Sequence, residues 1–350
     1  MSEGEVKAAL TEAALAERAK QTRSYWLRVG GAVVGLIIVM IVVNIASHGT
    51  FLEPGNLIRV LRQITYNAVL GFGQTFVIIT AGIDLSVGSL ISLTGVVMAI
   101  VANATHLTGF PLIAVTLAAG LAVGALAGYI NALPVVKLNL PPFITTLAMM
   151  LMAQGLSFKI SHGRPIPLNS DAFQNIGFGS FLGSITDKLH LPGIPIPVIW
   201  MIVIAVICSV LLMRTRFGRY VFAIGGNEEA ARLAGVNVHR IKTLVYVISG
   251  MAAAVAGFLL MANFSSGSPQ TGTGDELLQS IAAVVVGGTS LMGGRGTIIG
   301  TFFGALLIGV LNNVMNLLNI ESYTQNIVLG GVIVIAVVLD ELRRRYIVKA

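Results

Sequence analysis

The chain has 350 residues, of which 55% are hydrophobic and only 11% are charged. Soluble globular domains carry about 25% charged residues, so this composition excludes an ordinary soluble protein and indicates an integral membrane protein in contact with membrane lipid. The net charge of +7 does not point to nucleic acid as a partner, because positive charge in membrane proteins collects on the cytoplasmic side. The single cysteine, Cys208, can form no internal disulfide and is expected to be a packing residue.

Ten apolar runs predict membrane-spanning helices. A helix crosses the hydrocarbon core with about 20 apolar residues, and the candidate runs lie at 29–47, 62–81, 86–104, 112–133, 142–160, 196–213, 243–263, 277–293, 297–318 and 323–339. The second and the eighth are the weakest, because glycine and polar residues interrupt them. The predicted fold class is all-α, a polytopic membrane protein of about ten helices, with a polar N-terminal segment (1–28) and a basic tail (341–350).

The distribution of lysine and arginine orients these spans. With the N-terminus in the cytoplasm, 17 of the 22 basic residues fall inside and 5 outside. The cytoplasmic excess of positive charge favours ten spans with both termini cytoplasmic. Two long loops follow from this topology, an outer loop at 161–195 and an inner loop at 214–242.

The inner loop predicts a short helix with a signal at each end. Asparagine is a good N-cap, acidic residues suit the first turn, alanine favours helix and glycine commonly ends one. The helix is marginal alone and must pack on something, either lipid headgroups or a partner protein. The residues concerned are Asn227, Glu228, Glu229, Ala230, Ala231, Arg232 and Gly235.

One carboxylate, Asp84, interrupts the apolar stretch "VIITAGIDLSVGSLISL". Gly82 and Gly88 allow the helix to break there, and Asp84 and Ser86 can both cap the helix that follows. Irregular backbone at membrane depth is tolerated where it is buried or lines a cavity. The stretch therefore predicts a capped helix break, which can also border a transport pathway.

A second glycine-rich stretch, "GGTSLMGGRGT" (Gly287–Thr297), resembles a phosphate-binding loop but fails the pattern. Gly294 and Arg295 stand where Gly-Lys-Ser/Thr is required, so the chain is not expected to hydrolyse ATP. Gly293 and Gly294 instead predict a second helix break, at the cytoplasmic end of the eighth span.

Neutral polar side chains inside the spans are candidates for a substrate path, with interhelical hydrogen bonding as the alternative. Amides suit a neutral polyol better than an anion. No histidines have metal-ligand spacing, no catalytic constellation is visible, and no cofactor is expected. The candidates are Asn67, Gln74, Thr75, Asn131, Gln154, Asn312, Asn313, Asn316, Gln325 and Asn326. The glycine sets 120/124/128 and 300/304 predict close helix packing.

Four stretches resemble permease subunits of ATP-binding-cassette importers, in the ribose/xylose/galactoside branch: "TAGIDLSVGSLISLTG", "LPPFITTLAMM", "TRFGRYVFAIGGNEEAARLAGVNV" and "AAVVVGGTSLMGGRGTIIGTFFGALLIG". The likeness covers about residues 50–340 and implies the importer permease fold for the transmembrane domain (29–340), in a bacterial inner membrane. It implies a homodimer with two ATPase subunits and a periplasmic sugar-binding protein as partners. Glu229-Ala230-Ala231 and Gly235 would then mark the coupling helix that docks on the ATPase.

Alternatives remain within and outside this class. The resemblance favours a monosaccharide such as ribose as cargo, while a nucleoside, an autoinducer or an amino acid stays open. An ion-coupled secondary transporter would also have broken helices, but the coupling-type loop argues against it. The lack of catalytic residues argues against a membrane-embedded enzyme.

Overall fold

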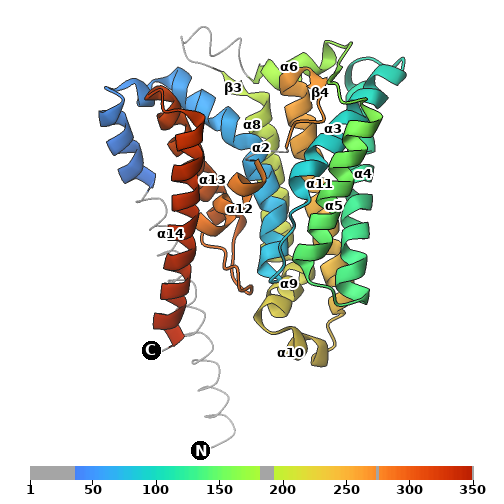
Figure 1. Cartoon of the computed structure of the whole chain (residues 1–350), viewed down its shortest axis with the longest axis vertical. Helices are drawn as coiled ribbons and strands as arrows, with labels where there is room; N and C mark the ends of the chain where they lie inside the picture. The colour runs from blue at the N-terminus through green and yellow to red at the C-terminus, as the bar shows by residue number, and fades with distance from the viewer. Residues whose placement is uncertain (1–35, 182–192, 273–275, 349–350) are drawn as a thin grey trace, which may run out of the picture.

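The computed structural model describes residues 36–181, 193–272 and 276–348, and these form a bundle of long helices (Figure 1). The predicted segment 1–28 and the start of the first span lie outside the described residues. A helical segment at 36–46 comes first. The long helices are α2 (Pro54–Ile79), α3 (Val87–Ala104), α4 (Gly109–Lys137), α5 (Pro142–Ile160), α8 (Ile196–Arg214), α11 (Val238–Phe264), α13 (Ile298–Leu317) and α14 (Ser322–Val348), and the shorter elements are η1 (Thr50–Leu52), α6 (Ala172–Phe178), α9 (Arg216–Gly226), α10 (Glu228–Leu233) and α12 (Glu276–Val286).

Within the described residues, six helices are long and apolar enough to cross a membrane: α3, α4, α5, α8, α11 and α13. The predicted count of ten is therefore not confirmed. Helix α2 is long but less apolar than these six, and it begins at Pro54 rather than at residue 62, because proline suits the first turn of a helix. The eighth predicted span was wrong over its second half. Helix α12 ends at Val286, since Gly288 adopts a positive φ that ends the helix.

Helix α11 lies at the centre of the bundle and packs against α2, α3 and α4. Glycines permit the closest of these contacts. A Cβ added at Gly124 of α4 would lie 2.3 Å from the Gly250 carbonyl oxygen of α11, and one at Gly128 would lie 2.2 Å from that of Tyr246. The third predicted member, Gly120, faces the Met98 side chain of α3 instead. The predicted glycine stripe is thus a packing surface for two helices.

The outer-loop region forms small antiparallel pairs at the end of the bundle that carries α6 (Figure 1). Strand β1 (Ile166–Pro167) pairs with β4 (Ser266–Gly267), and β2 (Ser180–Phe181) pairs with β3 (Ile194–Pro195). Helix α6 packs on α11, where the Phe173 ring meets Phe258 edge to face. The opposite end of the bundle carries α9 and α10, and we refer to it below as the α10 end.

Replacement of Gly128 by alanine is expected to lower the melting temperature of the detergent-purified protein. The added Cβ would press on the backbone of Tyr246, which cannot rotate away, and overpacking of this kind costs about 1–3 kcal/mol. Gly155→Ala in α5 is the matched control, because nothing lies within 4 Å of its added Cβ. The control should keep or raise the melting temperature, and equal melting temperatures for the two variants would contradict the packing.

Candidate functional site

The first helix break lies between Ile79 of α2 and Val87 of α3, and Asp84 is fully buried within it. One carboxylate oxygen, Oδ1, accepts hydrogen bonds from the Ser86 amide (3.0 Å) and the Ser86 hydroxyl (2.6 Å). The other, Oδ2, accepts from the Ser249 hydroxyl of α11 (2.8 Å). A buried charge is normally paired, yet the ion pairs among the described residues do not include Asp84. Hydrogen bonds alone satisfy it.

Two further amides complete this group. The Asn131 side chain of α4 donates to the Ser86 hydroxyl (2.8 Å) and, at 3.4 Å, to Asp84 Oδ1. The Gln74 side chain of α2 donates to the Asp84 backbone carbonyl (2.5 Å). Asp84 is thereby connected to α2, α4 and α11, and the break is held in place by three helices.

The predicted capping role of Asp84 and Ser86 was wrong in its geometry. Ser86 does occupy the N-cap position of α3, but its side chain accepts no amide of the helix. An N-cap residue needs extended backbone angles to place its oxygen, whereas Ser86 is already helical (φ −75°, ψ −18°). Its hydroxyl turns to Asp84 instead, and Asp84 accepts an amide that precedes the helix.

The predicted glycines of the first break allow close approach to other segments. A Cβ added at Gly82 would lie 2.9 Å from the Tyr246 hydroxyl oxygen of α11. One at Gly88 would lie 2.4 Å from the Gly272 carbonyl oxygen. Both positions are therefore closed to larger side chains.

The second break, residues 287–297, meets the first at the α10 end. Gly293 and Gly294 have φ angles of 84° and 73°, in the left-handed region that favours glycine. The Gly294 amide donates to the carbonyl of Ile79, the last residue of α2 (2.8 Å). Helix α9 also packs against this contact. A Cβ added at its Gly225 would lie 1.7 Å from the same Ile79 carbonyl oxygen. Sequence reasoning missed Gly225, although "IGGN" stands directly before the predicted coupling helix.

Helix α10 is capped as predicted. Asn227 Oδ1 accepts the Ala230 amide (2.9 Å), and Gly235 follows the helix with φ 83°. Ala231 is buried against the protein, whereas Glu229 and Leu233 are exposed, Leu233 to 82%. The preceding helix, α9, was not predicted. Helix α10 therefore presents a small, defined surface on which the Leu233 side chain is largely exposed.

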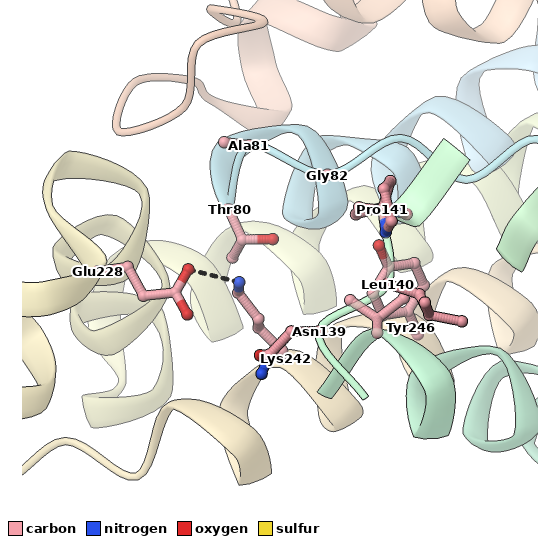
Figure 2. A pocket seen from close by; sticks show the side chains of 11 residues that line it. Thr80, Ala81, Gly82, Asn139, Leu140, Pro141, Glu228, Lys242 and Tyr246 are labelled. Carbon is pink, nitrogen blue, oxygen red and sulfur yellow. Dashed lines mark hydrogen bonds and ion pairs between the residues drawn. The ribbon is translucent and has the colours of Figure 1, made fainter. Parts of the chain in front are cut away.

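The Glu228 side chain of α10 reaches the neighbouring helix α11. Its carboxylate forms an ion pair with Lys242 of α11 (2.5 Å) and a longer one with Arg232 of its own helix (3.4 Å). Beside this pair lies a cavity of about 310 Å³ (Figure 2). Its walls are Thr80–Gly82 of the first break, Asn139–Pro142 of the α4–α5 link, Glu228, Lys242 and Tyr246.

The polar side chains predicted for a substrate path are distributed over separate interhelical pairs. Asn67 of α2 and Asn312 of α13 both donate to Gln279 of α12 (2.7 and 3.2 Å). Thr75 and Thr301 share a hydrogen bond of 2.7 Å between α2 and α13. A role for any of them in the path stays a prediction.

The remaining candidates are scattered. Asn313 exchanges hydrogen bonds with Asn56 of α2 (2.9 and 3.0 Å). Gln325 of α14 donates to Asn316 (2.9 Å), which is exposed. Gln154 is half-buried and Asn326 is exposed. Sequence reasoning missed Asn56 because it precedes the predicted span, and it missed Ser249 and Gln279 because nothing local marks them.

Comparison with known proteins identifies the family. The family described as "Branched-chain amino acid transport system / permease component" matches residues 56–337. The chain belongs to this permease family. It is 41% identical over 323 residues to the ribose import permease protein RbsC of Escherichia coli K12, covering 91% of this chain and 95% of that protein.

Two other relatives extend the comparison. The ribose import permease protein RbsC of Bacillus subtilis 168 is 45% identical over 312 residues, with 89% and 92% covered. The fructose import permease protein FrcC of Rhizobium meliloti is 37% identical, with 89% and 84% covered. No solved structure matches the chain. The resemblance to sugar-importer permeases that the motifs indicated is confirmed, and the chain is a multi-pass membrane protein.

Two substitutions of Asp84 are expected to differ in thermal stability. In Asp84→Asn the side-chain carbonyl oxygen can still accept from Ser86, and the side-chain NH2 group can donate to the Ser249 hydroxyl. The loss of thermal stability should therefore be small. Asp84→Ala leaves buried donors without acceptors, each costing about 1–3 kcal/mol, and should lower the melting temperature strongly. Asp171→Ala, at an exposed aspartate beside α6, is the control. An asparagine variant as unstable as the alanine variant would show that the charge itself is needed.

Proposed function

We propose that this chain is the membrane-spanning permease subunit of an ATP-driven importer in a bacterial inner membrane, and that its cargo is a monosaccharide, ribose first. The similarity to ribose import permeases carries this proposal, because it covers 91% of this chain and 95% of the Escherichia coli relative. The relative named for fructose is less similar, at 37%. The family description also names branched-chain amino acids, which makes an amino acid the second candidate cargo.

The ATP chemistry belongs to a partner in this proposal. Helix α10 is the coupling helix, and it docks on an ATPase subunit through Glu229 and Leu233. Support comes from its two caps and from the 82% exposure of Leu233, since an apolar side chain this exposed beside a rigid helix suits a partner's pocket. Two copies of the chain with two ATPase subunits form the transporter, and both termini lie in the cytoplasm on the α10 side.

Transport then proceeds by alternating access. A periplasmic binding protein delivers the sugar at the α6 end, and the permease opens inward as the ATPases change state. The two helix breaks at the α10 end serve as the joints of this movement, because in transporters discontinuous helices lie at the interface of the parts that move against each other. Glu228, Ala230 and Arg232 complete the predicted coupling surface.

Two substitutions on α10 test the proposal in the complete transporter. Glu229→Lys and Leu233→Asp should each lower recovery of the cognate ATPase in co-purification by about tenfold, which corresponds to about 1.4 kcal/mol of docking free energy. Uptake of radiolabelled ribose should fall in parallel. Leu107→Asp, at an exposed leucine in the α3–α4 link at the opposite end of the bundle, is the control for ATPase recovery and should leave that recovery unchanged.

The outcomes distinguish the two alternatives for α10, the ATPase or lipid headgroups, and the two candidate cargoes, a sugar or an amino acid. Full ATPase recovery and full uptake in both α10 variants would contradict docking of α10 on the ATPase. That result would favour a helix that lies on lipid headgroups. Uptake of radiolabelled leucine, without uptake of radiolabelled ribose, would favour the amino-acid alternative.

A further inference from the structure

Three residues of α11 form a line from the coupling helix to the first helix break. Lys242, Tyr246 and Ser249 are four and three positions apart, so they share one face of the helix. Lys242 binds Glu228 of α10, and the Ser249 hydroxyl donates to Asp84. Between them, Tyr246 brings its hydroxyl against Gly82. One face of one helix thus touches both α10 and the break.

The cavity explains why this face matters. Its walls include Thr80–Gly82 of the first break and the Glu228–Lys242 pair (Figure 2). A displacement of Glu228 can reach Asp84 through α11, because Lys242 of that helix pairs with Glu228 and its Ser249 hydroxyl donates to Asp84. The cavity also leaves room for the ion pair to move without a steric clash.

The Glu228–Lys242 ion pair is suited to forming and breaking. Lys242 is 18% exposed and Glu228 is 40% exposed at their side chains, so water partly screens their attraction. Glu228 has Arg232 within 3.4 Å as a second partner on its own helix. If the Glu228 carboxylate separates from Lys242, it still has Arg232 as a partner. The free energies of the paired and the separated arrangement are therefore close.

We propose that Lys242 is a positioning residue for transport: its ion pair with Glu228 ties the coupling helix to α11 and so transmits movement of α10 to the Asp84 break. The inference rests on the proposed function, because it requires that α10 moves with an ATPase. It assigns one route of transmission to this pair of charges and to one face of α11, in addition to the contact that α9 makes with the two breaks at Gly225. Neither residue needs to touch the cargo.

A charge exchange in the assembled transporter tests this tie. The complex with ATPase and binding protein is reconstituted in lipid nanodiscs or vesicles, and sugar uptake and ATP hydrolysis are measured together. Lys242→Glu should lower the uptake per ATP hydrolysed by roughly fivefold or more, the lower end of coupling between linked sites, while the ATPase still co-purifies. The double variant Glu228→Lys with Lys242→Glu should restore the ratio.

Two control variants distinguish the effect of the Glu228–Lys242 ion pair from a general effect of charge or of misfolding. Arg240→Glu makes the same charge change two residues away, at an exposed side chain of α11, and should leave the ratio unchanged. Lys242→Met keeps the aliphatic stem and should fail like Lys242→Glu without loss of thermal stability.

Two results would overturn the inference. One is an unchanged ratio in Lys242→Glu. The other is a double variant as defective as Lys242→Glu alone, which would mean that the two residues act on separate partners. If the unsubstituted chain retains no ATPase at all, the proposed function fails first, and the inference fails with it.

Discussion

The arrangement of the bundle depends on how Asp84 is accommodated inside a membrane protein by hydrogen bonds rather than by a cation. Its oxygens are bound by Ser86 of the same break and by Ser249 of α11, and Asn131 of α4 completes the group. Where water is absent, each polar atom must find its partner within the protein. The break between α2 and α3 is therefore fixed by other helices, and those helices cannot move independently of it.

The same requirement joins the second break to the first. A helix end leaves carbonyls without intrahelical partners, and the free carbonyl of Ile79 accepts the amide of Gly294. Only a glycine at position 225 leaves space for that bond. Helix α9 therefore continues into α10 directly from the point at which the two breaks meet. In the proposed transporter, a small shift of α10 acts on two spans at once.

The sequence correctly predicted structural features that depend on residues close together in the chain. The caps of α10, the position of the first break and the glycine contacts of α4 all follow from short segments. It could not predict partners far along the chain: Ser249 lies 165 residues from Asp84, and many serines compete for that role. The expected capping by Ser86 failed because tertiary contacts set its backbone angles. The separate amide pairs have the same cause, since packing between helices decided them, whereas α12 is shorter than predicted because Gly288 ends it.

The central claim is that the two breaks and α9 form a single junction. Hydrogen–deuterium exchange of the protein in nanodiscs, compared between Gly225→Ala and Gly226→Ala, tests it most directly. An added Cβ at residue 225 would lie 1.7 Å from the Ile79 carbonyl oxygen, whereas at residue 226 it would meet nothing within 4 Å. The account predicts faster exchange at both 80–90 and 287–297 in Gly225→Ala and unchanged exchange in Gly226→Ala. Equal exchange in the two variants, or a change confined to one segment, would contradict it.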